Sequence, residues 1–207
     1  MAKEPIPALN TIVAALATDH KNKFYNLILP INSPRNIEDI NQAEILQTLD
    51  QNFRNSNGKS LLHIAVELKN MDLLRCCIET LNMDVNTQDN GGQTALNTAV
   101  LEDSRDMAEY LILNKANVNL ANHVGNSPLY TTLYSPRNAN KVEMARLLLS
   151  NGANVDQTNN AGDTPLKSCV EPGSDILFPV ADLLMGYGAD VLPIRKYATS
   201  MNSYHFP

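Results

Sequence analysis

Apolar residues fall in pairs of short runs at helical spacing, and polar stretches that contain glycine separate the pairs. Within residues 61–78 this pattern predicts two helices, one around Ile64 and one around Leu74. Residues 89–119 repeat it: D-N-G-G-Q-T leads into A-L-N-T-A-V, a second helical run follows, and A-N-V-N closes the unit. The pattern therefore predicts an all-α chain of two-helix units joined by polar loops.

The same order of residues occurs four times at nearly constant spacing. A glycine stands near the start of each unit, at positions 58, 92, 125 and 162, so the steps are 34, 33 and 37 residues. Two residues after each glycine comes Ser or Thr, and an apolar run follows. Self-similarity with a period of about 33 residues is typical of stacked repeats, in which each unit buries its apolar side against its neighbours.

These repeats resemble the ankyrin repeat, whose core reads D-x-x-G-x-T-P-L-H-x-A and whose end reads G-A-D-V-N. The core is matched by G-K-S-L-L-H-I-A from Gly58, by G-N-S-P-L-Y from Gly125 and by G-D-T-P-L-K from Gly162. The end is matched by A-N-V-N at residues 116–119. The resemblance covers residues 53–191 and implies an ankyrin-repeat solenoid of about five helix-turn-helix units joined by hairpin-like loops.

The resemblance divides the chain into three parts. Residues 1–52 are expected to form N-terminal capping helices, residues 53–191 four ankyrin repeats, and residues 192–207 a C-terminal cap and tail. The third and fourth repeats contain extra residues between their two helices, at 134–140 and 171–174. Insertions in a repeat map to loops, which often carry binding residues.

The N-terminal part fits the repeat poorly. Residues 8–29 are either a degenerate repeat or an unrelated helical hairpin that packs on the first clear repeat. Pro30 and Pro34 then interrupt the chain, and residues 37–49 are predicted to form one inserted helix. This insertion either fills space or offers a distinct contact surface.

Most of the repeated residues are explained by architecture. We expect the glycines to have positive φ before each first helix, and the Ser or Thr two residues later to cap that helix. The resemblance assigns His63 to bracing the turn by hydrogen bonds within and between repeats. Asn97, Tyr130 and Lys167 stand at the equivalent positions, and only Asn97 is expected to keep similar polar contacts.

The composition of the chain argues against nucleic acids and membranes as binding partners. The chain has 207 residues, a formal net charge of −6 and a pI of about 5.1, so it lacks the basic surface that nucleic acids require. No apolar run approaches the ~20 residues of a membrane span, and the first seven residues do not form a secretory signal. Three cysteines without metal-binding spacing indicate a reducing compartment. We therefore expect a cytoplasmic protein that binds neither nucleic acid nor membrane.

No motif predicts catalysis, a metal ion or a cofactor. The four histidines lie at positions 20, 63, 123 and 205, and no pair has metal-binding spacing. The tripeptide G-K-S at 58–60 resembles part of a phosphate-binding loop, but Phe53 stands where the first glycine of that motif belongs. We expect no enzyme; the alternative is an enzyme whose site lies in the insertion at residues 30–52.

The resemblance implies recognition of another protein through the concave side of the first helices and the projecting hairpin tips. Carried over by position, the predicted partner-binding residues are Asn57, Lys59, Glu67, Leu68, Asn90, Gln93, Leu101, Glu102, His123, Val124, Asn126, Tyr134, Asn160 and Asp163. Tyr134 is the predicted anchor, because exposed aromatic residues are favoured at the centre of interfaces. We expect a monomer in the absence of the partner. The alternative is an injected bacterial effector that sequesters or inhibits a protein in the host cytosol, since ankyrin proteins of intracellular bacteria are similarly small and Asn-rich.

Overall fold

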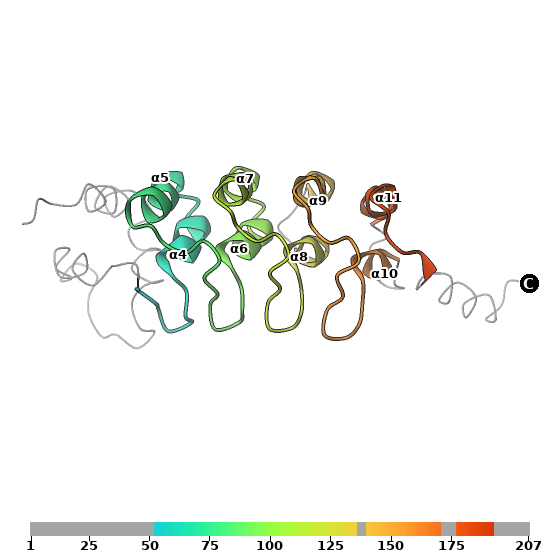
Figure 1. Cartoon of the computed structure of the whole chain (residues 1–207), viewed down its shortest axis with the longest axis horizontal. Coiled ribbons are helices and arrows are strands. Elements are labelled where there is room, and N and C mark those ends of the chain that lie inside the picture. The colour runs from blue at the N-terminus through green and yellow to red at the C-terminus, as the bar shows by residue number, and fades with distance from the viewer. Residues whose placement is uncertain (1–51, 136–139, 171–176, 193–207) are drawn as a thin grey trace, which may run out of the picture.

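The computed structural model describes residues 52–135, 140–170 and 177–192. These residues form four helix pairs that stand side by side in a row (Figure 1). The first unit holds α4 (Leu61–Glu67), α5 (Met71–Arg75) and the π-helical turn η2 (Cys76–Thr80), and the other three hold α6 (Ala95–Leu101) with α7 (Arg105–Leu113), α8 (Pro128–Tyr134) with α9 (Lys141–Ser150), and α10 (Pro165–Cys169) with α11 (Phe178–Gly186). The described residues contain no β-strand, and the predicted all-α solenoid is confirmed.

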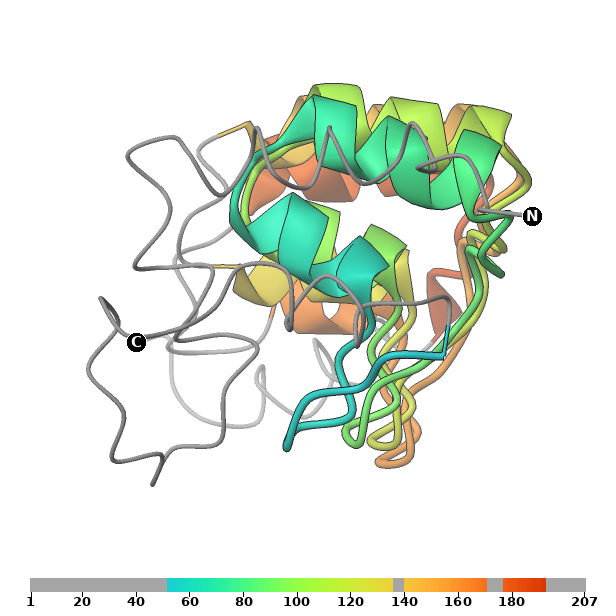
Figure 2. The ribbon, with the colours of Figure 1, turned by 90° about the vertical axis from the view of Figure 1, so that its left-hand side faces the viewer.

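The helices form two layers, and the loops between units project from one of them. In the view along the row, the first helices α4, α6, α8 and α10 lie in one layer and the second helices in the other (Figure 2). The loops extend from the first-helix layer and overlie one another in this view. Each first helix packs against the first helix of the next unit, so one continuous core runs the length of the row.

Each first helix begins at the Ser or Thr that the sequence predicts as its cap. The four capping residues have extended backbones and are Ser60, Thr94, Ser127 and Thr164. In the second unit the Asn97 N–H donates to Thr94 Oγ1 at 3.1 Å, which satisfies one of the free amides of the first helical turn. Pro128 and Pro165 occupy the first helical position, where no amide hydrogen is needed.

A residue with left-handed backbone follows the end of each second helix. The φ angle is +48° at Asn82, +73° at Lys115 and +88° at Gly152. This conformation lets the Ala116 N–H reach back and donate to the Leu111 carbonyl at 3.0 Å. Glycine adopts it without strain, whereas the Cβ atom of Lys115 makes it costly.

A small residue stands where the two helices of a unit approach each other. Ala65, Ala99, Thr132 and Cys169 occupy this position, and each is fully buried. Cys77 is also fully buried, and Cys77 and Cys169 are both free thiols. Burial raises the pKa of both thiols to about 12, because the thiolate would lose its hydration.

Several sequence-based expectations fall outside the described residues. They concern the degenerate repeat at residues 8–29, the inserted helix at 37–49, most of the two long loops, and the C-terminal cap beyond residue 192. These stay predictions. Among the helices that are described, none is both long enough and apolar enough to cross a bilayer.

Candidate functional site

We call the hairpin tips and the exposed positions of the first helices together the inner face, and the predicted binding residues other than Leu68 belong to it. An Asp or Asn side chain shapes each hairpin. In the second hairpin, Asp89 Oδ1 accepts from the N–H groups of Gly91 at 2.8 Å and Gln93 at 2.9 Å, and the Gly92 N–H donates to the Asp89 carbonyl at 2.9 Å. In the other hairpins the accepting side chains are Asn55, Asn122 and Asn159. Such a tight turn requires the positive φ observed at Gly92, +76°.

Neighbouring hairpin tips are joined in a hydrogen-bonded row. The backbone N–H of each tip donates to a carbonyl of the preceding tip: Asn90 to Asn57 at 3.0 Å, His123 to Gly91 at 3.0 Å and Asn160 to Val124 at 3.1 Å. The side-chain amides of Asn90 and Asn160 add bonds to the carbonyls of Ser56 at 3.2 Å and His123 at 2.9 Å. The structure therefore brings the predicted tip residues together as one exposed ridge.

In the first and fourth units, predicted residues of the inner face form ion pairs within their own unit. Lys59 Nζ forms an ion pair with Glu67, and these side chains are only 23% and 15% exposed. Lys167 Nζ forms the corresponding ion pair with Asp163. The charged groups at both ends of the row are thus occupied within their own units.

Leu68 corrects one of the predictions. It was assigned to the surface, but its side chain is 2% exposed and belongs to the hydrophobic core. The helix ends at Glu67, and the Leu68 N–H still donates to the Ile64 carbonyl at 3.0 Å. This geometry holds Leu68 as the cap of α4 with its side chain buried, and it is not part of the inner face.

In the second and third units, the equivalent positions carry no charge. The residues equivalent to Lys59, His63 and Glu67 are Gln93, Asn97 and Leu101 in the second unit and Asn126, Tyr130 and Tyr134 in the third. The rings of Tyr130 and Tyr134 stack with centroids 5.2 Å apart, and the Tyr130 hydroxyl lies 2.9 Å from Ser168 Oγ. Burial raises the pKa of Tyr130, so its hydroxyl stays neutral. Tyr134 remains 54% exposed beside it.

Lys141 supports the end of the helix that carries Tyr134. Its Nζ donates to three carbonyls at the end of α8, those of Thr132, Leu133 and Ser135, at 3.2, 2.6 and 2.9 Å. Burial lowers the pKa of Lys141. Ser135 Oγ in turn donates to the Leu101 carbonyl at 2.9 Å, which places the ends of α6 and α8 together, next to the partly exposed Glu102. Sequence reasoning missed Lys141, although a lysine directly after a long loop was a usable signal.

His63 braces the first unit against the second, as the resemblance implied. Its Nε2 lies 2.8 Å from the Gln93 carbonyl, and its Nδ1 lies 2.8 Å from Ser60 Oγ and 3.2 Å from the Ser60 N–H. A carbonyl only accepts, so Nε2 carries the proton and Nδ1 accepts from Ser60. Burial lowers the pKa of His63, which keeps the ring neutral.

Asn97 does not take over this role, and the expectation that it would is wrong. It is as buried as His63, at 0% exposed, but neither Oδ1 nor Nδ2 has a hydrogen-bonding partner among the described residues. The amide is shorter than an imidazole and does not span the gap to the next unit. Tyr130 and Lys167, which were not expected to keep polar contacts, bond to Ser168 and Asp163.

Large exposed apolar side chains occur at three places among the described residues. The third unit carries Val124, 59% exposed at its hairpin tip, and Tyr134 at the end of its first helix. The outer side of α7 carries Leu113, 71% exposed. The last described helix and the residues after it carry Phe178, Met185, Tyr187 and Leu192. Only the first of these groups lies on the inner face.

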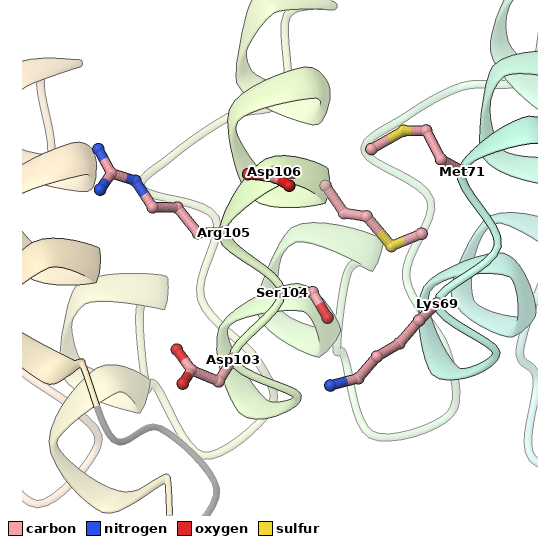
Figure 3. A pocket seen from close by; sticks show the side chains of 7 residues that line it. Lys69, Met71, Asp103, Ser104, Arg105 and Asp106 are labelled. Atoms are coloured by element: carbon pink, nitrogen blue, oxygen red, sulfur yellow. The ribbon is translucent and has the colours of Figure 1, made fainter.

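A row of cavities follows the turns between first and second helices, away from the hairpins. The first cavity, of about 410 Å³, lies between the first two units and is lined by Lys69, Met71, Asp103, Ser104, Arg105, Asp106 and Met107 (Figure 3). Two more, of about 300 and 410 Å³, continue the row toward α9 and α11. Both acidic and basic side chains line these cavities. Arg105 Nη1 lies 3.7 Å from Glu143 Oε2. No histidine or cysteine lines them, and the described residues hold no group of His, Cys, Asp or Glu suited to a metal ion.

Comparison with known proteins identifies the repeats. A family model described as ankyrin repeats in three copies matches residues 14–122, more than half of the chain, and another described as an ankyrin repeat matches residues 124–160. The chain is also similar to the Neurogenic locus Notch protein of Drosophila melanogaster, with 33% identity over 88 residues. Those residues are 42% of this chain but 3% of that protein, so the chain spans a small part of the relative's length.

Proposed function

Because the chain belongs to the ankyrin-repeat family, we propose that it works by binding another protein through its inner face. Stacked two-helix units suit a protein-interaction module, because the repeats bury their shared apolar positions in one core and leave the hairpin tips and a few exposed positions at the surface. The similarity to Notch covers too little of that protein to carry over its activity or its partners.

One observation carries the choice of the inner face. The third unit exposes Val124 at its hairpin tip and Tyr134 at the end of its first helix, and no Asp, Glu, Lys or Arg occurs between residues 116 and 136. Val124 lies among the polar residues of the hydrogen-bonded hairpin tips. Interfaces between proteins have this composition, with an apolar or aromatic centre and a polar rim.

Photo-crosslinking tests the proposal directly. A photoreactive phenylalanine analogue replaces Val124 in the full chain, and the protein is irradiated in an extract of its own cells. We expect one predominant crosslinked protein, because Val124 would lie inside the interface.

Leu113 provides the matched control. It is also apolar and even more exposed, but it lies on the outer helix α7. The same analogue at Leu113 should give no such product. Equal crosslinking at both positions, or none at Val124, would contradict the assignment of the inner face.

Two alternatives remain: the protein is an injected bacterial effector, or it is an enzyme. An injected effector would use the same face on a host protein, and the crosslinking experiment performed in host-cell extract identifies that protein. The enzyme alternative places its site in residues 30–52, nearly all of which lie outside the described residues. The cytoplasmic location and the monomeric state stay predictions.

A further inference from the structure

The helices α10 and α11 stand at the end of the described row (Figure 1), and their unit exposes three apolar side chains there, Phe178, Met185 and Leu192. We call these three side chains the end surface. We infer that residues 194–201 of the same chain form an amphipathic helix that covers the end surface. Such a helix gives the predicted C-terminal cap a defined docking surface, and it is independent of the proposed function.

Met185 lies on the side of α11 that faces away from the third unit. In the second unit Tyr110 faces the first unit, because its hydroxyl donates to Glu79 Oε1 at 2.6 Å. Ile112 lies about 200° further round the same helix, and therefore on the side of the third unit. Leu149 and Met185 are the residues equivalent to Ile112 in α9 and α11. Leu149 is buried, whereas Met185 is 45% exposed.

Phe178 lies on the same side of α11, seven residues before Met185. The equivalent residues of the second and third units contact the unit that follows. Arg105 Nη1 lies 3.7 Å from Glu143 Oε2 of the third unit, and Val142 lines a cavity together with Val180 of the fourth. Phe178 is 61% exposed. The end surface therefore uses positions that, in the earlier units, are turned toward a neighbour.

Leu192 interrupts a series of hydrogen bonds between units. In each of the first three units, a side-chain oxygen after the second helix accepts a backbone N–H of the next unit. The pairs are Asn86 Oδ1 with the Asn117 N–H at 2.7 Å, Asn119 Oδ1 with the Asn154 N–H at 2.7 Å, and Asp156 Oδ1 with the Asp190 N–H at 2.9 Å. The fourth unit has Leu192 at this position, 60% exposed, and its side chain accepts no hydrogen bond. The end surface thus suits an apolar cover better than another unit of the same kind, whether from this chain or from a second copy.

Residues 194–201 have the pattern of a helix with one apolar side. Apolar residues recur at i, i+3, i+4 and i+7, and polar residues occupy the other positions; the apolar residues are Ile194, Tyr197, Ala198 and Met201. A helix of this length extends about 12 Å, and Phe178 and Met185 are about 10 Å apart along α11. No glycine follows Gly188 in the sequence, so residues 193–207 lack the glycine of the hairpin that precedes each first helix.

The chain connection and the charge both favour this segment as the occupant. Ile194 comes two residues after Leu192, so the segment stays at a high effective concentration beside the end surface. Asp182 is exposed on α11 between Phe178 and Met185. The segment carries the opposite charge, on Arg195 and Lys196. An apolar stripe with neighbouring cations is complementary to an apolar surface that includes a carboxylate.

A single tryptophan tests whether the end surface is covered, because the natural chain has none. Phe178→Trp places an indole on the end surface of the full chain. Leu113→Trp places one on the outer side of α7 as the uncovered reference. Acrylamide quenching of the indole emission then measures solvent access. With the segment docked about nine-tenths of the time, Phe178→Trp should be quenched about tenfold more slowly than Leu113→Trp, at every protein concentration.

Two further substitutions in the Phe178→Trp chain give the matched comparison. Ala198→Asp places a carboxylate in the apolar stripe and should abolish the protection, because docking would bury the charge. Thr199→Asp adds the same charge on the polar side of the segment and should leave the protection unchanged. Met201→Asp repeats the first change at the other end of the stripe. Circular dichroism melts establish that the repeats of all variants are folded.

Three results would overturn the inference. The first is equally fast quenching of Phe178→Trp and Leu113→Trp, and the second is an equal effect of Ala198→Asp and Thr199→Asp. The third is protection that increases with protein concentration, which would assign the end surface to a second copy. None of them affects crosslinking at Val124, so the proposed function is judged separately.

Discussion

The end units and the middle units of the inner face carry different chemistry on the same backbone. In the first unit Lys59 is paired with Glu67, and in the fourth Asp163 is paired with Lys167. At the equivalent positions the second and third units carry only uncharged side chains, and Tyr134 is exposed. The ends of the face therefore pair their own charged groups, while the middle exposes the aromatic side chain of Tyr134.

This comparison distinguishes the backbone features that all four units share from the side chains that differ between units. The repeated glycines, caps and hairpin bonds fix the backbone of every unit alike. The residues at three positions, one just before the first helix and two within it, differ between units. We propose that these positions and the tips determine which units bind the partner.

The largest expected loss of stability comes from a glycine whose hairpin tip contacts the next hairpin, compared with a glycine whose tip contacts none. Gly92→Ala should lower the free energy of unfolding by about 3 kcal/mol, because φ is +76° and the added Cβ would lie 2.6 Å from the His123 backbone nitrogen. Gly162→Ala should cost about 1 kcal/mol, since φ is +80° but no described atom lies within 4 Å. Urea unfolding measures both, and equal costs would contradict the hydrogen-bonded row of tips.

Two separate substitutions, His63→Asn and Asn97→His, test what the side chain at this position contributes to the contact with the next unit. His63→Asn should lower the free energy of unfolding by about 2 kcal/mol, because the Gln93 carbonyl loses its donor. Asn97→His should raise it by about 1 kcal/mol, because the longer ring can bond to the third unit as His63 does to the second. A destabilised Asn97→His variant would show that this second contact has no room for the ring.

The pH dependence of stability isolates His63 further. Its pKa in the folded chain is lowered below the ordinary 6.5, so protonation favours the unfolded chain. Its contribution is therefore complete above about pH 6.5 and declines as the pH falls below that value. Melts between pH 7.5 and 5 should show a smaller decline for His63→Asn than for the wild type. Identical declines would mean that other groups control the acid response.

The smallest effect concerns the ion pairs at the ends of the face. Glu67→Gln should lower the free energy of unfolding by about 0.5 kcal/mol, because a partly exposed ion pair contributes little. Added salt should shrink the difference. Binding of the crosslinked partner by this variant should equal that of the wild type, and a clear loss of binding would place the first unit within the interface.

Local signals made most of the described fold predictable from the sequence. A glycine with positive φ and a Ser or Thr cap each act within a few residues, and each was found where predicted. The period of these signals then determined the stacking. The burial of Cys77 fits the same pattern, since Cys77 falls on the apolar side of its helix.

The candidate site was less predictable because it depends on contacts between units. The burial of Leu68 follows from where α4 ends, and the unpaired amide of Asn97 follows from the distance to the third unit. Sequence position alone reports neither distance. The support of Tyr134 by Lys141 crosses a loop of variable length, which no repeat pattern encodes.

The central claim is that the middle of the inner face binds the partner, with Tyr134 as its anchor. Titration calorimetry of the crosslinked partner against the wild type and Tyr134→Ala, with circular dichroism melts of the same samples, tests it most directly. We predict a loss of about 2 kcal/mol in binding, roughly thirtyfold in affinity, and a change in stability below about 0.5 kcal/mol. Unchanged affinity, with or without a fall in melting temperature, would contradict the claim.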